Sequence, residues 1–223
     1  RVVRRSNRRA VAKSVSLTVI ADMVCIALTG GIACGKSTVA AFWQRWGAQV
    51  ADADVLAHEL IAPHGACVDA VLKEFGAQMQ AADGGVDRTK LAAVVFPDAA
   101  ARQRLEALLH PEVIRRMRAW VAEVRRDGLC GVGVVPLLFE VGLEKDGWDA
   151  IVCVTSSEAA VLARLAQRGL TPAEAQARIA SQWPVSEKAA RSDRVIENNG
   201  SLAELETACR TVWNDLFEEG DTK

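Results

Sequence analysis

The sequence lacks any hydrophobic window of membrane-spanning length that is free of charged residues, although half of its residues are apolar. A helix that crosses a bilayer needs about 20 consecutive apolar residues. We therefore expect a globular, water-soluble protein with no membrane partner. At 223 residues, the chain is long enough for one sizeable α/β domain with an inserted or appended lobe.

Cysteine pairs with the spacing of a metal site or a redox motif are also lacking, because no C-x-x-C occurs. The six cysteines are spread along the chain at positions 25, 34, 67, 130, 153 and 209. We expect them to be reduced, small apolar side chains, as in a protein of the cytoplasm.

A strong overall charge is absent too, since the formal net charge is −1. Residues 1–22 carry six basic side chains against Asp22 alone, a net charge of +5, which leaves the rest at −6. A mildly acidic body is a poor match for nucleic acid, which we do not expect as a partner. An anionic substrate must then be held by a few local cations.

The sequence does not begin with methionine, and Met23 stands just before the first expected strand. We expect the natural domain to begin at Met23, with residues 1–22 an extension outside the fold. Because this extension is rich in arginine and almost free of acidic residues, it also resembles an organellar transit peptide, which stays open as an alternative.

The most informative stretch, residues 24–46, is an apolar run, a glycine-rich turn and a helix-forming run. Its centre, residues 30–38, reads GGIACGKST and fits G-x-x-x-x-G-K-[ST]. Glycines let the backbone wrap an anion with its N–H groups inward, and the helix N-terminus adds partial positive charge. The sequence predicts a phosphate loop for ATP, in which Lys36 reaches the outer phosphates and the Ser37 hydroxyl binds Mg²⁺. The expected nucleotide contacts in this loop are Gly31, Ile32, Ala33, Cys34, Gly35, Lys36, Ser37 and Thr38.

Short apolar strands alternate with helical runs along the rest of the chain. Strands are expected at residues 49–52, 130–135, 150–154 and 194–197. Such alternation predicts a P-loop NTPase fold, a mostly parallel sheet flanked by helices on both faces. Ligands then bind beyond the carboxyl ends of the strands.

Residues 66–126 contain helical patterns and no convincing strand. We expect a helical substrate-binding lobe at about 63–127, inserted into a core of residues 23–62 and 128–223. Asp98 is placed to cap a helix of this lobe. Residues 165–192 are expected to form a lid.

Two carboxylates, Asp52 and Asp54, follow the second expected strand. Phosphoryl transfer needs charge neutralisation and a well-placed acceptor more than covalent help from the protein. A carboxylate near the γ-phosphate orients the acceptor hydroxyl and takes its proton, and Asp54 is our candidate for this catalytic role. We expect Asp52 either to contact metal-bound water or to cap the next helix, and capping is the alternative for Asp54 as well.

A usual Walker-B aspartate is missing, because the strand at 130–135 is followed by Pro-Leu-Leu-Phe-Glu. Mg²⁺ must therefore depend on Ser37, nucleotide oxygens, water and either Asp54 or Glu140.

Several basic side chains follow the strand at 150–154, namely Arg164, Arg168, Arg178, Lys188 and Arg191. A lid that closes over ATP uses one or two such cations to neutralise charge and exclude water, and Arg164 and Arg168 are the candidates. For the other three, a solvated helix face is the expected explanation.

Motifs of other P-loop classes are absent. No Asn-Lys-x-Asp, no Asp-x-x-Gly and no LSGGQ-like segment occurs. These absences disfavour guanine-nucleotide switches and transporter ATPases, and a compact chain with a helical lobe and an arginine-bearing lid favours a small-molecule kinase.

Five ordered segments then give the chain a specific resemblance. They read ALTGGI with GKST, DAD, LHP, VVPLLFE and DRVIENNG, beginning at residues 27, 52, 109, 134 and 193. In this order they resemble the dephospho-CoA kinase family, over nearly the whole chain from Met23. The resemblance implies phosphorylation of the ribose 3′-hydroxyl of dephospho-CoA by ATP, giving CoA and ADP, and a nucleotide core with a helical CoA-binding lobe and a lid.

The resemblance also implies roles for single residues. Asp54 matches the carboxylate that activates the 3′-hydroxyl, and Arg164 matches a lid arginine at the ATP phosphates. Asn198 and Asn199 are placed near the adenine. The acceptor pocket is implied to be lined by His110, Pro111, Leu137, Leu138, Phe139 and Glu140. A lone histidine in a helical segment is usually structural, so the assignment of His110 rests on the resemblance.

Two loop residues depart from the family pattern, since Ala33-Cys34 stands where the family usually has Gly-Ser or a similar small pair. Alanine fits there without strain only at negative φ, because a positive φ would cost about 1 kcal/mol. Cys34 would place a thiol beside the phosphates.

The runner-up is another kinase of the same fold, acting on a nucleoside monophosphate or a shikimate-like acceptor. Such pockets usually carry arginines that grip a phosphate or carboxylate, and residues 52–62 have none. A nucleotide-dependent regulatory protein without turnover is the alternative from another class. We expect a monomer or a small homo-oligomer.

Overall fold

A computed structural model describes residues 24–218, so the expectations for residues 1–22 lie outside the described range. Five parallel strands form one sheet in the order β2-β3-β1-β4-β5. Their bounds are Cys25–Gly30 for β1, Gln49–Asp52 for β2, Gly131–Val134 for β3, Ala150–Thr155 for β4 and Arg194–Glu197 for β5. The last four match the expected ranges to within one residue at either end. The predicted parallel α/β fold is confirmed.

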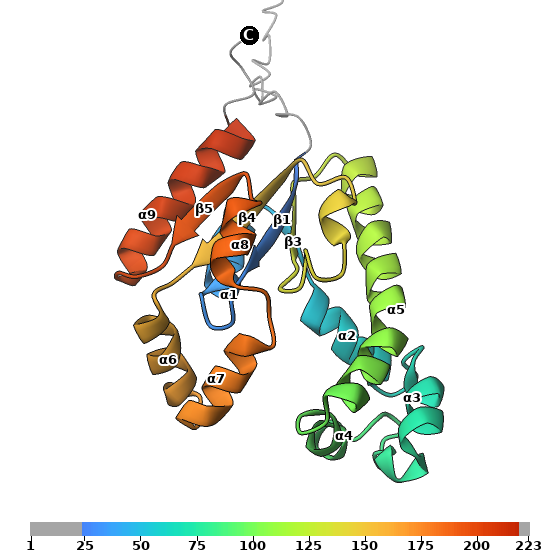
Figure 1. Cartoon of the computed structure of the whole chain (residues 1–223). Coiled ribbons are helices and arrows are strands. Elements are labelled where there is room, and N and C mark those ends of the chain that lie inside the picture. Colours follow the sequence, from blue (N-terminus) through green and yellow to red (C-terminus); the bar gives the residue numbers. More distant parts are fainter. Residues whose placement is uncertain (1–23, 219–223) are drawn as a thin grey trace, which may run out of the picture.

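Helices connect the strands and extend beyond them (Figure 1). The α-helices are α1 Lys36–Arg45, α2 Ala53–Ile61, α3 Val68–Phe75, α4 Arg88–Val95, α5 Ala99–Arg126, α6 Glu158–Gln167, α7 Pro172–Ala180, α8 Val185–Ala190 and α9 Leu202–Trp213. Two 3-10 turns, Ala77–Met79 and Leu143–Lys145, and a π-helical turn, Asn214–Glu218, complete the described elements. The predicted Asp98 cap is present, because its carboxylate accepts from the backbone amides of Ala100 and Ala101 at 2.8 and 3.1 Å.

The two faces of the sheet are covered by different helices because successive side chains of a strand point to opposite faces. In β1, Ile26 and Leu28 belong to an apolar core that includes Trp43 of α1 and Cys209 of α9. Ala27, between them, packs on the other face in a second cluster with Met117 of α5. The central strand is thus buried on both faces, as a parallel sheet requires.

The helices α3, α4 and the first half of α5 have an apolar core of their own. It includes Val71 of α3, Leu91 of α4 and Val113 of α5, together with Leu60 at the end of α2. An isolated bridge between Gln80 and Val86 is the only strand-like pairing described between residues 66 and 126. The extent of a separate substrate lobe and of a lid, as functional units, stays a prediction.

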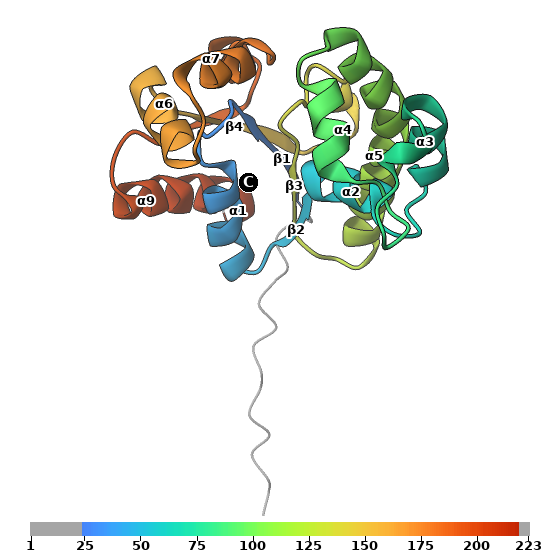
Figure 2. The same cartoon turned by 90° about the horizontal axis from the view of Figure 1, so that it is seen from below.

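Two helical groups project beyond the carboxyl ends of the strands on opposite sides of the sheet, α6 with α7 on one side and α2 to α5 on the other (Figures 1 and 2). The guanidinium of Arg178 on α7 lies 5.0 Å from the centre of the Phe96 ring that follows α4, so the two groups approach each other there. None of the helices between residues 24 and 218 combines the length and apolar character that a bilayer crossing demands.

Candidate active site

The turn between β1 and α1 has the conformation of a phosphate loop. Gly30 and Gly35 have φ of 141° and 102°, which side chains rarely adopt, and a Cβ on Gly30 would collide with the carbonyl of Val154. Lys36, the first residue of α1, folds back so that its ammonium donates to the carbonyls of Gly30 at 3.1 Å and Gly31 at 2.9 Å. Burial lowers the pKa of Lys36, whereas an adjacent triphosphate favours the charged form.

Of the two possibilities for Ala33, the strained one with positive φ is present. Ala33 has a φ of 54°, in the left-handed region, and its methyl group is buried. The turn from β1 into α1 dictates this backbone shape, and alanine adopts it at a cost of about 1 kcal/mol.

Cys34, the next residue, is almost completely buried at 1% exposure. Burial raises the pKa of its thiol, and Lys36 opposes part of this shift. Cys34 lines a cavity of about 280 Å³ between the phosphate loop and α6 to α8, together with Gly31 and Trp183. Contact of the thiol with phosphates stays a prediction.

Hydrogen bonds from side chains outside the phosphate loop hold the carbonyl groups of the loop in place. Arg164 on α6 donates to the carbonyl of Ala33 at 3.0 Å and to that of Asn198 at 2.9 Å. The buried amide of Asn198, after β5, donates to the carbonyl of Cys34 at 2.9 Å. Ser156, after β4, accepts from Arg164 at 2.9 Å and donates to the carbonyl of Asn198 at 2.8 Å. Three segments that are distant in sequence thereby fix the peptide groups of the loop.

This network gives Arg164 and Asn198 contacts that the sequence did not predict. Both hold the loop, and their predicted contacts with ATP phosphates and adenine stay predictions. Asn199 accepts from the backbone amide of Ser157 at 2.7 Å, next to the start of α6. Ser156 was missed, because the segment at 155–158 reads as a helix cap; Ser157 makes that cap by accepting from the amide of Ala160.

Asp54 lies in the first turn of α2, directly beyond β2. Asp52 caps this helix, with its carboxylate accepting from the backbone amide of Asp54 at 2.8 Å. The capping alternative is therefore correct for Asp52, and Asp54 is free of that task. Although Asp54 is exposed, displacement of water by the surrounding protein raises its pKa, the charge of Asp52 raises it further, and Lys36 opposes both.

Asp54 opens onto a small cavity of about 80 Å³ whose walls are mostly apolar. His110 of α5 and the Pro136-Leu137 segment after β3 line this cavity. Three chain segments that are distant in sequence thus converge at this cavity, and its role as the acceptor pocket stays a prediction.

The other residues predicted to line the acceptor pocket do not line this cavity. Leu138 and Phe139 are buried in the core, and the Phe139 ring is stacked on Trp183 with centroids 6.4 Å apart. Pro111 is exposed within α5. Glu140 forms an ion pair of 2.7 Å with Lys188.

The expected solvated position of Lys188 is wrong, because its side chain is completely buried. The carboxylate of Glu140 and the carbonyl of Pro136 hold the ammonium inside. Arg168, Arg178 and Arg191 are exposed.

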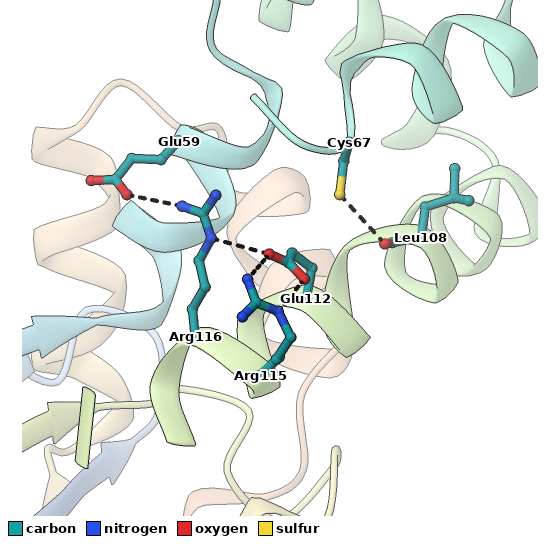
Figure 3. A network of polar contacts seen from close by, with 6 residues as sticks. All are labelled: Glu59, Cys67, Leu108, Glu112, Arg115 and Arg116. Carbon is teal, nitrogen blue, oxygen red and sulfur yellow. Dashed lines mark hydrogen bonds and ion pairs between the residues drawn. The ribbon is translucent and has the colours of Figure 1, made fainter. Parts of the chain in front are cut away.

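A polar network links α2 to α5, the helices that carry Asp54 and His110 (Figure 3). Arg116 of α5 lies between Glu59 of α2 at 3.4 Å and Glu112 at 3.3 Å. Arg115 adds two bonds to Glu112, of 2.8 and 2.6 Å, and these contacts lower the pKa of Glu112 to about 2.

The described residues offer few side chains that could bind a divalent cation. Among residues 24–218, no group of three or more His, Cys, Asp or Glu side chains could hold a metal. The exposed Ser37 is the second residue of α1, beside the loop. One hydroxyl with phosphate oxygens and water fits Mg²⁺, which usually keeps several waters and binds through few protein ligands.

Comparison with known proteins identifies the family. A family model described as dephospho-CoA kinase matches residues 24–204. The chain belongs to the dephospho-CoA kinase family. It is 46% identical to the dephospho-CoA kinase of Anaeromyxobacter dehalogenans, over 87% of this chain and 92% of that protein. The dephospho-CoA kinase of Geobacter sulfurreducens is 40% identical, over 87% of this chain and 100% of that protein.

Solved structures share the fold of this chain. TT1252 from Thermus thermophilus is 35% identical, with a TM-score of 0.68 and coverage of 87% of this chain and 98% of that one. The dephospho-CoA kinase from Campylobacter jejuni, 23% identical with a TM-score of 0.63, covers 89% of this chain and 100% of that one and shares the fold. The family match includes every predicted site residue, from Gly31 to Asn199.

Proposed function

We propose that this chain transfers the γ-phosphoryl group of ATP to the ribose 3′-hydroxyl of dephospho-CoA, releasing CoA and ADP. The observation that carries the proposal is the placement of Lys36 and Asp54 beyond the carboxyl ends of β1 and β2, the two strands that flank β3, where the charge of each group shifts the pKa of the other. One group suits a polyphosphate and the other an incoming alcohol.

In the proposed reaction, the 3′-oxygen forms a bond to the γ-phosphorus while the bond from that phosphorus to the β,γ-bridging oxygen breaks. ADP leaves with the electron pair of the broken bond. The carboxylate of Asp54 accepts the proton of the 3′-hydroxyl and later releases it to solvent. The Lys36 ammonium and the loop amides balance the charge on the phosphate oxygens.

Mg²⁺, when bound, would neutralise phosphate charge, and the Ser37 hydroxyl is the protein group placed to hold it. Arg164 keeps the loop in shape through the carbonyl of Ala33. Its predicted role at the ATP phosphates would require the guanidinium to share its donors between loop and nucleotide.

The apolar cavity beside Asp54 supports a neutral acceptor group. Alanine, valine, proline and leucine side chains form most of its wall, with Asp54 and His110 as the titratable members. An arginine that would grip a phosphate or carboxylate is absent from this lining, which disfavours the nucleoside-monophosphate and shikimate alternatives. We also propose that the enzyme acts in the cytoplasm, as a monomer or small homo-oligomer.

Coupled measurement of ADP release tests the reaction. The purified chain is assayed with ATP and Mg²⁺ in the presence of dephospho-CoA, AMP, shikimate or no acceptor. We expect release that depends on dephospho-CoA. Equal release without acceptor, or preference for AMP or shikimate, would contradict the proposal. Lys36→Ala should weaken both nucleotide binding and turnover.

A further inference from the structure

Lys188 carries a positive charge into the protein interior. Of the charged side chains between residues 24 and 218, it is the only one among the buried residues, with 0% exposure. Taking an ammonium group out of water costs several kcal/mol unless it is paired and hydrogen-bonded. A side chain held there at such a cost is expected to serve the site that its partners form.

The partners of Lys188 come from the segment that follows β3. Its Nζ donates to the carbonyl oxygen of Pro136 at 2.7 Å and lies 2.7 Å from Oε1 of Glu140. Oε1 of Glu140 also accepts from the backbone amide of Trp183 at 3.0 Å. Oε2 of Glu140 is buried and has no hydrogen-bond partner among the described residues, so the ammonium is the main counter-charge of this carboxylate.

These contacts connect the two cavities of the site. Pro136 lines the cavity of Asp54, and Trp183 lines the cavity beside the phosphate loop. The ammonium of Lys188 contacts the first of these residues directly and is linked to the second through Glu140, which accepts from the Trp183 amide. Its charge also acts on Lys36 and adds to the lowering of the Lys36 pKa that burial causes.

We propose that Lys188 is a positioning residue for phosphoryl transfer, one that fixes the acceptor wall at Pro136 relative to the phosphate loop. This inference rests on the proposed function. The Lys188 side chain is completely buried, so in this proposal it does not touch the substrate itself. It acts through the Pro136 carbonyl and through Glu140, which in turn holds the backbone at Trp183.

A structural role and a positioning role predict different results. Buried ion pairs are often no more stabilising than apolar residues of similar volume, whereas removal of one partner leaves an uncompensated charge. Lys188→Met should therefore lower Tm, and adding Glu140→Gln, which removes the orphaned charge, should recover most of the loss. In both variants the Pro136 carbonyl loses the ammonium at 2.7 Å and keeps the Thr29 hydroxyl, which donates to it at 3.3 Å.

The experiment compares the unmodified enzyme, Lys188→Met, the double variant Lys188→Met/Glu140→Gln, and Lys145→Met, in which an exposed lysine is replaced. Tm, kcat and the KM values for ATP and dephospho-CoA are measured for each. We expect the double variant to regain Tm while its kcat/KM for dephospho-CoA stays about 10- to 100-fold low, as a small misplacement of an acceptor produces. Its KM for ATP should change less than about threefold, since it keeps the phosphate loop and its support. Lys145→Met should match the unmodified enzyme.

Recovery of both Tm and acceptor kcat/KM in the double variant would assign Lys188 to stability alone and overturn the positioning role. Equal losses in the ATP and dephospho-CoA parameters, or failure of both variants to fold, would overturn it too. If the unmodified enzyme does not phosphorylate dephospho-CoA, the proposed function is wrong and the inference falls with it.

Discussion

Asp52 accepts a hydrogen bond of 2.8 Å from the backbone amide of Asp54, so one carboxylate caps the helix whose first turn carries the other. Both side chains lie at the carboxyl end of β2, and they have different roles. Asp52 is committed to the backbone, and its charge raises the pKa of its neighbour. Asp54 is left to face the cavity.

Replacement of the proposed base should separate binding from turnover. Asp54→Asn is expected to keep ATP affinity and to lower kcat by roughly two or more orders of magnitude, as loss of a general base commonly does. Titration with ATP and steady-state kinetics measure the two quantities. Asp69→Asn, an exposed change on α3, serves as the control and should leave both unchanged. Near-normal kcat in Asp54→Asn would remove Asp54 from the base role.

The pH profile should respond to the neighbouring charge. Burial and then Asp52 raise the pKa of Asp54, so the base form is lost, as pH falls, at a higher pH than for an ordinary aspartate. Asp52→Asn keeps a good helix cap but removes the charge. The acid limb of kcat/KM should therefore move to lower pH. An unmoved limb, or one at higher pH, would show that Asp52 does not set this pKa.

Replacing Ala33 by glycine should not lower the free energy of unfolding, although Ala→Gly changes usually do. Its φ of 54° strains alanine by about 1 kcal/mol, while glycine adds unfolded-state entropy of about 0.4–1 kcal/mol. Ala33→Gly should therefore change the free energy of unfolding by between zero and about 1 kcal/mol, towards higher stability. Ala41→Gly, at an exposed position inside α1, is the control and should lose about 1 kcal/mol. Denaturant titration measures both, and a loss at Ala33 equal to that at Ala41 would contradict the strain.

Cys34 should react slowly with alkylating reagents. The thiolate is the reactive form, and burial both raises the pKa of this thiol and blocks access to it. The rate should still be rising with pH at the ordinary thiol value of 9.0, and ATP should slow it further. Peptide mass spectrometry after iodoacetamide treatment measures the rate, with the partly exposed Cys130 as internal reference. Faster labelling of Cys34 than of Cys130, or no effect of ATP, would show that the thiol points away from the nucleotide.

Local patterns were sufficient to predict the strands and the phosphate loop. Every strand contains two or more apolar residues, and the glycines at 30 and 35 are required by backbone angles that the loop motif itself implies. The Asp98 cap was predictable for the same reason, since it depends on residues within one turn of helix. The choice between Asp52 and Asp54 as the cap of α2 was left open, because both types of side chain at these positions suit a cap.

Features that depend on distant partners were not predictable from the pattern. Lys188 follows Glu187 in a short helix and reads as a solvated residue, and only the fold brings Glu140, 48 positions earlier, to its ammonium. Leu138 was assigned to the acceptor pocket with its neighbours, although it is buried in the core and, of residues 137–140, only Leu137 lines the cavity. The positive φ of Ala33 contradicts the preference of alanine, and the loop imposes it.

The bonds that Arg164 and Asn198 make to the loop have a further consequence for the energetics of catalysis. Because the carbonyls of Ala33 and Cys34 are already occupied, the peptide groups cannot readily rotate when an anion arrives. In bulk water, solvent dipoles must reorient around a polyphosphate, which costs free energy. In this loop the peptide dipoles are oriented when the protein folds, so this cost is not repeated when the nucleotide binds. Each turnover then begins with dipoles that are already oriented.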